Sequence, residues 1–221
     1  MIERLLRYNR AVYDALRSML RPGMREMDVR RIIDETYAAV AGVSVPYAFD
    51  LVSGERTLAM GGPDTDRVLR EGDSVIVDLS PNLHGGWCDT TRTYFIGEPS
   101  PQILRQYHAL QETLAWMEAL IQPGMKGSEI YDAMNRCLME RGYSPLAHHA
   151  GHSITANDCC ARPEFVQEEQ MEIQEGMRIA LEPGIYEATG MRIENNYRGT
   201  GKGIENLFSY PLEPEYFIIR R

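Results

Sequence analysis

Apolar residues recur at helical spacing in four stretches of the chain, and this pattern predicts four amphipathic helices. The first covers residues 2–20 and ends at Arg21-Pro22-Gly23, while the second covers residues 27–41. The face of the second helix that should be buried carries Val29, Ile32, Ile33, Tyr37 and Val40.

The other two predicted helices lie in the second half of the chain, over residues 101–121 and 128–140. Ser100 and Pro101 form a typical helix start, with serine as the capping residue and proline at the first helical position. Pro123-Gly124 ends the third helix, and Gly142 ends the fourth.

Residues 75–94 have the pattern of a hairpin in which each strand carries a carboxylate. An apolar run leads into Asp78. Asn82 and the Gly85-Gly86 pair are typical of a turn, and Asp89 begins the returning strand. A short turn brings such a pair to the same level of the sheet. Two facing carboxylates need a cation between them, because otherwise one of them is driven to protonate. Residues 45–58 are expected to form a strand and a loop, and residues 178–182 another strand.

The two halves of the chain repeat the same order of features. Pro22-Gly23-Met24 recurs 101 residues later as Pro123-Gly124-Met125, and the strand that ends at Asp78 recurs 104 residues later as one that ends at Glu182. A second carboxylate follows in each half, Asp89 in the first and Glu194 in the second. Several matches in one order favour an internal duplication. A pseudo-twofold arrangement of the halves would bring all four carboxylates together.

Composition narrows the classes of function. The net charge of −9 and the absence of a run of Lys and Arg argue against nucleic-acid binding. No stretch approaches the roughly 20 apolar residues of a membrane span, and residues 1–7 lack the features of a leader, so we expect a cytoplasmic protein. The four cysteines have neither disulfide-scaffold density nor zinc-finger spacing, which favours ordinary reduced thiols, the adjacent Cys159 and Cys160 included.

Four converging acids favour a metal centre, although one other interpretation remains open. Carboxylates with an imidazole suit Mn, Co, Fe or Zn, and four carboxylates suit two ions better than one. Buried ion pairs with Arg92 and Arg192 are the alternative. The candidate imidazoles are those of His148, His149 and His152; His84 in the turn and His108 on a helix are interpreted as solvated or satisfied residues.

With these motifs, essentially the whole chain resembles the pita-bread metallopeptidases, the group of methionine aminopeptidases, Xaa-Pro aminopeptidases, prolidases and creatinase. The resemblance implies an α/β fold with a curved antiparallel sheet, flanking helices and an internal pseudo-twofold duplication. It also implies two divalent metal ions, with Asp78 on one ion, His152 and Glu182 on the other, and Asp89 and Glu194 bridging both. The motifs Glu182-Pro183-Gly184-Ile185-Tyr186, His148 four residues before His152, and Gly203-Ile204-Glu205-Asn206-Leu207 resemble the Xaa-Pro branch.

The chain departs from the family pattern at two histidines. Met60 stands before Gly61-Gly62-Pro63 where the peptidases usually have one, and Cys159 stands seven residues after His152 where they have another. In the family such histidines bind the substrate carbonyl, stabilise developing charge or pass protons. We therefore expect Met60, Cys159 and His148 to contact the substrate, with Glu182 as the proton shuttle and His148 as a second catalytic residue. Arg92 and Arg192 are expected to orient the ligand carboxylates.

The resemblance predicts a metal-dependent hydrolase, an Xaa-Pro-type aminopeptidase or dipeptidase that acts on short peptides. A hydrolase or lyase for a non-peptide small metabolite, like creatinase, is the alternative, and a non-catalytic binding module is a third interpretation. We expect one catalytic domain over residues 1–221, with halves at about 1–99 and 100–221. No part corresponds to the N-terminal domain that many members carry, and a homodimer is left open.

Overall fold

The computed structural model of the protein describes residues 1–83 and 85–220, so the interpretation of His84 falls outside the described residues. The helices are α1 (Ile2–Met19), α2 (Glu26–Ala41), α3 (Pro101–Leu120), α4 (Gly127–Glu140) and the short α5 (Pro214–Phe217). The four long helices confirm the helices predicted from apolar periodicity. Ser100 caps α3 as expected, since its side chain accepts a hydrogen bond from the backbone N–H of Ile103.

The strands form two larger sheets and one hairpin. The first sheet has the order β1 (Tyr47–Ser53), β2 (Ser74–Leu83), β4 (Thr90–Ile96) and β12 (Ile218–Ile219), with β3 (Gly86–Trp87) paired to β2. The second has the order β11 (Gly203–Asn206), β10 (Asn195–Thr200), β7 (Arg178–Leu181), β5 (Gly151–Ile154) and β6 (Ala161–Glu164). The hairpin pairs β8 (Gly184–Tyr186) with β9 (Gly190–Arg192). Apart from the parallel β4–β12 pair, the pairings between these strands are antiparallel.

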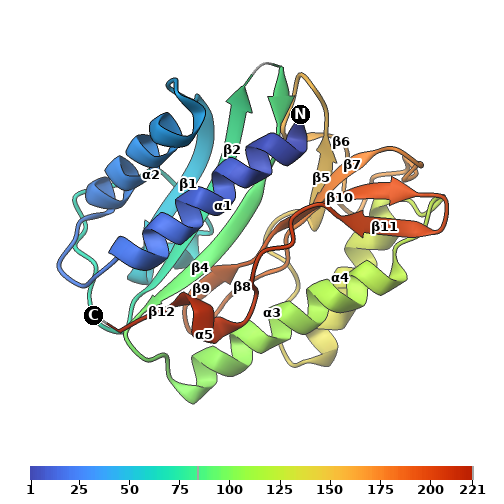
Figure 1. Cartoon of the computed structure of the whole chain (residues 1–221). Helices are drawn as coiled ribbons and strands as arrows, with labels where there is room; N and C mark the ends of the chain where they lie inside the picture. The colour runs from blue at the N-terminus through green and yellow to red at the C-terminus, as the bar shows by residue number, and fades with distance from the viewer. Residues whose placement is uncertain (84, 221) are drawn as a thin grey trace.

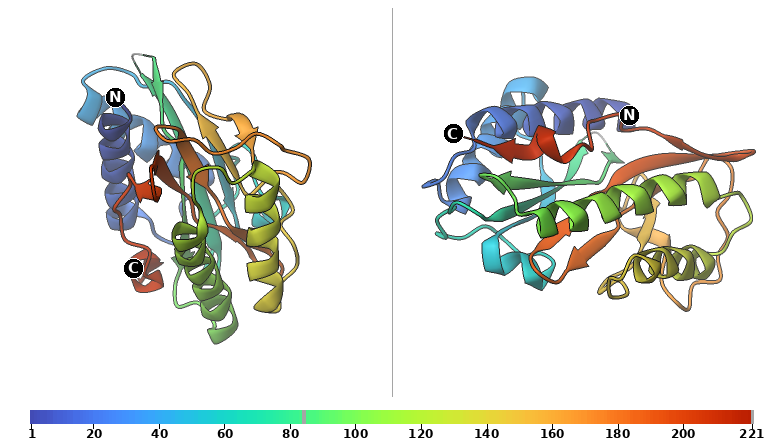
Figure 2. Two further views of the ribbon diagram at one scale, coloured as in Figure 1. Left: turned by 90° about the vertical axis from the view of Figure 1, so that its right-hand side faces the viewer. Right: turned by 90° about the horizontal axis from the view of Figure 1, so that it is seen from below.

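Each half of the chain contributes one sheet and two long helices. Figure 1 shows α1 and α2 beside the sheet of β1, β2 and β4, and α3 and α4 beside the sheet of β5, β7, β10 and β11. The further views in Figure 2 show the two sets of strands running through the molecule with the helices outside them. An antiparallel bridge between Thr91 and Glu194 links the two sheets.

Both halves of the chain contain a left-handed glycine and a matching cap at the start of the second helix. Gly23 and Gly124 both adopt a φ of 90°, a left-handed conformation that favours glycine. The backbone N–H of Arg25 donates to the carboxylate of Asp28 at the start of α2, and that of Lys126 donates to Glu129 at the start of α4. These matched turns and caps accord with the duplication inferred from the sequence.

Three details of the predicted elements are wrong. The strand expected to end at Asp78 continues to Leu83, so Asn82, expected in the turn, lies in β2. Residues 54–59, expected as a loop, form a 3-10 helix, η1 (Gly54–Ala59), which Thr57 stabilises by donating its hydroxyl to the carbonyl of Gly54. Val40 is 41% exposed, although it shares a helical face with buried Tyr37. It stands in the last turn of α2, two residues before left-handed Gly42, where packing against the rest of the molecule ends.

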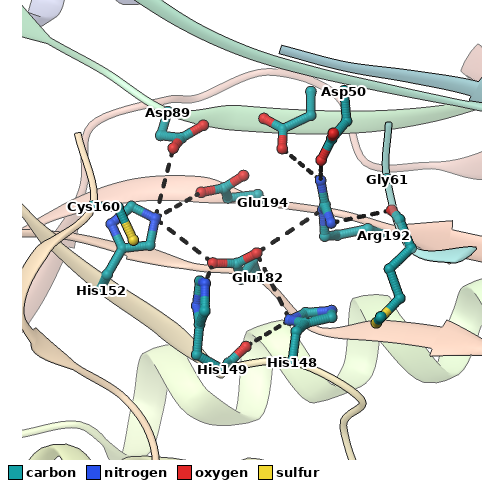
Figure 3. Close-up of a pocket in the computed structure, with 12 residues that line it drawn as sticks. Asp50, Gly61, Asp89, His148, His149, His152, Cys160, Glu182, Arg192 and Glu194 are labelled. Atoms are coloured by element: carbon teal, nitrogen blue, oxygen red, sulfur yellow. Dashed lines mark hydrogen bonds and ion pairs between the residues drawn. The ribbon is translucent and has the colours of Figure 1, made fainter. Parts of the chain in front are cut away.

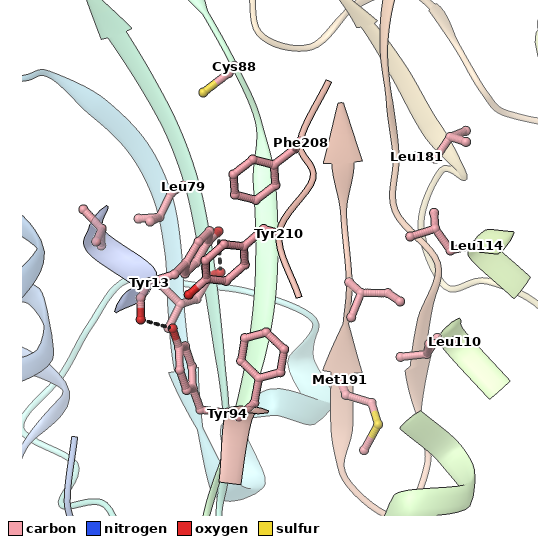
Figure 4. Close-up of a cluster of buried hydrophobic side chains, with 14 of the residues drawn as sticks. Tyr13, Leu79, Cys88, Tyr94, Leu110, Leu114, Leu181, Met191, Phe208 and Tyr210 are labelled. Carbon is pink, nitrogen blue, oxygen red and sulfur yellow. Dashed lines mark hydrogen bonds between the residues drawn. The ribbon is translucent and has the colours of Figure 1, made fainter. Parts of the chain in front are cut away.

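The hydrophobic core runs between the helices and the sheets (Figure 4). Tyr13 of α1 is fully buried, and its hydroxyl donates a hydrogen bond of 2.6 Å to the carbonyl of Thr90. Phe208 and Tyr210 stack with ring centroids 5.4 Å apart and bring the C-terminal segment into the core. Among the described residues, no helix is long and apolar enough to cross a membrane.

The core predicts a stability difference between two leucines. Leu114 of α3 is fully buried, so Leu114→Ala should lower the free energy of unfolding by about 2–5 kcal/mol through lost burial and a cavity. Leu58→Ala is the matched control, because Leu58 is 46% exposed, and surface changes usually stay within about 0.5 kcal/mol. Urea denaturation measures both, and equal losses for the two variants would contradict this packing.

Candidate metal centre

The five predicted metal ligands come from both halves of the fold. Asp78 lies in the middle of β2 and Asp89 just before β4, while His152 lies in β5. Glu182 follows the last residue of β7, and Glu194 stands between β9 and β10. All five line one cavity of about 240 Å³. The structure therefore brings together the complete set that the sequence singled out.

The same cavity contains only some of the predicted substrate contacts. Met60 lines it. So do His148, His149, Asp50 and Gly61, which Figure 3 labels. Cys159 is not among the lining residues, and its neighbour Cys160 stands there in its place. Cys159 is half-buried close to the centre, and burial followed by the charge of Asp89 raises its pKa to about 12.

His152 is oriented with one ring nitrogen toward the acids. Its Nδ1 lies 3.1 Å from its neighbour's carbonyl, that of Ser153, which can only accept, so Nδ1 carries the proton. The Nε2 atom, which the neutral ring would offer to a metal, faces Asp89 Oδ2 at 3.6 Å, Glu182 Oε1 at 3.6 Å and Glu194 Oε1 at 3.9 Å. This is how proteins commonly prepare a metal-binding imidazole.

Several buried oxygens at this point lack a hydrogen-bond donor. In the described part of the chain, Asp78 Oδ1, Glu182 Oε1 and Glu194 Oε1 are buried without a hydrogen-bond partner. His149 Nδ1 lies 2.9 Å from Glu182 Oε1, but without the geometry of a hydrogen bond. Unpaired buried carboxylate oxygens are costly, and a bound cation satisfies them. The donor set therefore fits divalent metal ions.

The electrostatics of the acids lead to the same conclusion. Burial, followed by the charge of Asp89, raises the pKa of both Asp78 and Glu194 well above the usual range. Burial raises the pKa of Asp89 to about 6, although the hydrogen bond from Ser80 opposes this change. For Glu182, burial is outweighed by the nearby histidines, His149 foremost, which hold its pKa well below the usual value. The crowded acids thus lack enough positive charge from the protein.

Arg192 supplies part of the positive charge, as expected if buried ion pairs stabilise the acids. Its Nη2 binds Asp78 Oδ2 at 2.5 Å and Asp50 Oδ2 at 3.2 Å, and its Nε is 4.0 Å from Glu182 Oε2. Asp50 and Asp78 are directly opposite each other on β1 and β2, where two like charges repel. Arg192 therefore serves Asp50, Asp78 and, more distantly, Glu182, while Asp89 and Glu194 have no arginine ion-pair partner among the residues described.

Arg92 acts on the backbone instead of on a carboxylate. It is fully buried, and its Nη1 donates to the carbonyl of Glu194 at 2.7 Å while its Nη2 donates to Asn195 Oδ1 at 2.8 Å. It thus fixes the main chain that carries Glu194. The expectation that Arg92 orients ligand carboxylates directly is not what the contacts show.

Hydroxyl groups hold two of the ligand carboxylates. Ser80 Oγ donates to Asp89 Oδ1 at 2.7 Å, and Thr91 Oγ1 donates to Glu194 Oε2 at 2.8 Å. Each contact occupies one carboxylate oxygen and leaves the other facing His152. The two acids are therefore oriented toward the centre in advance.

His148 lies between the metal centre and Tyr186. Its Nδ1 donates to the carbonyl of His149 at 2.7 Å, and its Nε2 is 2.9 Å from the hydroxyl of Tyr186. Burial lowers the pKa of His148 to about 4, so the ring is neutral and Nε2 accepts from Tyr186.

Sequence reasoning missed several contacts of the site, including that of the Thr91 hydroxyl with Glu194. Asp50, Ser80 and Tyr186 had no assigned role, although Ser80 stands two residues after Asp78 in the hairpin and Tyr186 closes the Glu-Pro-Gly-Ile-Tyr motif. Alternation along β2 places Ser80 on the same face as Asp78, and this signal could have identified it. Asp50 carries no comparable signal, because its role depends on the pairing of β1 with β2.

The serine contact predicts a loss of metal affinity without a loss of fold. Ser80→Ala removes the donor that orients Asp89, so Mn²⁺ should bind about 10–100-fold more weakly. Isothermal titration calorimetry measures the change, with Ser209→Ala, an exposed position away from the cavity, as the control. Unchanged affinity in Ser80→Ala would mean that Asp89 needs no such orientation.

Comparison with known proteins agrees with this geometry. The probable dipeptidase PepE of Mycobacterium tuberculosis is 32% identical over 209 residues, covering 91% of this chain and 54% of that protein. The Xaa-Pro dipeptidase of Pyrococcus furiosus is 30% identical over 190 residues, covering 84% of this chain and 54% of that protein. The crystal structure of dipeptidase PepE from Mycobacterium ulcerans superposes with a TM-score of 0.89 at 29% identity, covering 96% of this chain and 58% of that one.

The chain thus spans little more than half the length of these relatives. The structural likeness confirms the expected pita-bread fold. The two relatives are named as a probable dipeptidase and an Xaa-Pro dipeptidase, which agrees with the resemblance to the Xaa-Pro branch. Residues 1–200 match the sequence model of metallopeptidase family M24. The chain belongs to metallopeptidase family M24.

Proposed function

We infer that this chain is a hydrolase that uses two divalent metal ions to remove N-terminal residues from short peptides, as an Xaa-Pro-type aminopeptidase or dipeptidase. The observation that carries the proposal is the convergence of Asp78, Asp89, His152, Glu182 and Glu194 on one cavity, with unpaired carboxylate oxygens facing one another. The names of the M. tuberculosis and P. furiosus relatives support a dipeptide substrate.

The ligand assignment implied by the family accords with the distances. His152 Nε2 faces Asp89, Glu182 and Glu194, which would form one ion's surroundings. Asp78 keeps one unpaired oxygen for the second ion, while Arg192 binds its other oxygen. When bound, such a pair of ions lowers the pKa of a water molecule toward neutrality and polarises a carbonyl group. Mn, Co, Zn and Fe all suit these ligands.

The protein's own groups would then move protons and orient the substrate. Glu182 is the proposed proton shuttle, because it lines the cavity beside the acids that would hold the ions and the surrounding histidines keep it ionised. Neutral His148 lines the cavity and is held by Tyr186, so its role is to position the substrate rather than to supply charge. Arg192 keeps Asp78 and Asp50 in place during the reaction.

Met60 favours a second candidate, the cleavage of a small non-peptide amide. Its thioether lines the cavity where family peptidases usually present an imidazole, and a thioether cannot donate a hydrogen bond to a carbonyl oxygen. Losing one such donor typically costs about 10²–10³-fold in rate. Peptides with Xaa-Pro and Met-Ala termini distinguish the two candidates, because no turnover at full metal occupancy would favour the non-peptide substrate.

Asp89 provides the direct test of a metal-dependent reaction. Asp89→Ala removes a ligand proposed to bridge both ions, so turnover of the best dipeptide should fall below detection. Arg136→Ala, at an exposed position of α4, should leave turnover unchanged. Assays with added Mn²⁺ measure both variants, and near-normal turnover by Asp89→Ala would rule out the bridging role.

Restoring the family histidine at position 60 should raise peptide turnover. Met60 lines the cavity, so Met60→His places a hydrogen-bond donor there. We expect at least a tenfold rise in kcat for Xaa-Pro dipeptides, because removing such a donor typically lowers the rate by more than this. Met60→Leu controls for the change in shape, and an equal rise in that variant would contradict a role for the donor.

A further inference from the structure

A second group of metal-binding side chains stands at the edge of the cavity. The ligand atoms of His149, Cys160 and Glu164 all lie within 4.8 Å of one another. None of the three belongs to the five ligands of the dinuclear centre. His149 and Cys160 line the cavity, as Figure 3 shows, so the group adjoins the proposed active site.

The β5–β6 pairing explains why these residues meet. His152 and Glu164 are partners across the two strands, and the register shifts between His152 and Ser153. His149 stands two residues before β5, and Cys160 immediately precedes β6. The hairpin therefore brings residues from its entry, its loop and its returning strand to one place.

The three donors differ in kind from those of the dinuclear centre. A thiolate, an imidazole and a carboxylate, with water as a fourth ligand, suit a tetrahedral ion such as Zn²⁺. Two ligands on such an ion are about 3.5 Å apart at ordinary bond lengths of about 2.0–2.3 Å, so the observed spacing needs only small side-chain movements. Thiolate selects softer ions than the carboxylates that suit Mn²⁺.

The surroundings leave the group free to bind an ion. Cys160 is exposed, and the Glu164 side chain is 42% exposed, so both can be reached from solvent. His149 Nε2 lies 3.9 Å from Glu164 Oε1. Among the residues described, no arginine or lysine lies within ion-pair distance of Glu164, and its partner His149 is itself one of the three proposed ligands.

We propose that His149, Cys160 and Glu164 form a third metal site, selective for a soft or borderline divalent ion such as Zn²⁺. On binding, the Cys160 thiol and the His149 ring each lose a proton to solvent, and a sulfur–metal bond and a nitrogen–metal bond form, with no change of oxidation state. The bound ion ties the segment before β5 to the start and end of β6. It thereby fixes the wall of the cavity formed by His149 and Cys160.

Cd²⁺ is the probe, because a thiolate bound to it gives an ultraviolet charge-transfer absorption that oxygen and nitrogen ligands do not give. Cd²⁺ added to the Mn²⁺-loaded protein should produce this absorption, saturating at one equivalent per chain, while the bound Mn²⁺ stays constant. Cys160→Ser should abolish the absorption, and His149→Ala should weaken Cd²⁺ binding at least tenfold. Cys159→Ser, the adjacent cysteine, is the matched control and should keep it.

Absence of the absorption in the unmodified protein, or its persistence in Cys160→Ser, would overturn the proposal. Loss of the absorption in Asp89→Asn would overturn it as well, because the thiolate would then belong to the dinuclear centre. The readout is independent of hydrolysis. A chain that binds Cd²⁺ at Cys160 but cleaves no peptide would therefore contradict the proposed function alone.

Discussion

Four carboxylates that face one another, three of them buried and that of Asp78 half-buried, impose the main physical constraint on this protein. Asp78, Asp89, Glu182 and Glu194 line one cavity, and burial raises the pKa of three of them. Arg192 neutralises only part of this charge. Charges of one sign are held together in a protein interior only when cations offset them. The unpaired oxygens and the Nε2 atom of His152 face the place where such cations would bind.

The duplicated scaffold explains how acids so far apart in sequence converge. Asp78 in β2 and Glu182 after β7 occupy matching positions in the two halves, and so do Asp89 and Glu194. The bridge between Thr91 and Glu194 joins the halves beside the cavity, and buried Arg92 secures the same junction through the carbonyl of Glu194. The site is thus built on strands and strand ends, which hold ligands more firmly than free loops do.

The sequence predicted the elements whose signals are local or repeated. Apolar periodicity gave the four long helices, and the repeat identified the carboxylates, because both patterns lie within short segments. Contacts that depend on tertiary structure were missed. Asp50 meets Arg192 across 142 positions, and the choice of Cys160 over Cys159 for the cavity wall depends on the path of the loop before β6. Spacing alone does not determine either of these contacts.

The five residues are proposed to hold two metal ions side by side. Anomalous X-ray diffraction from crystals grown with Mn²⁺, recorded at the manganese absorption edge, would locate these ions. Two manganese peaks about 3.5–4 Å apart are expected, enclosed by Asp78, Asp89, His152, Glu182 and Glu194. A cavity with no manganese peak at saturating Mn²⁺, or peaks only outside these five residues, would contradict this proposal.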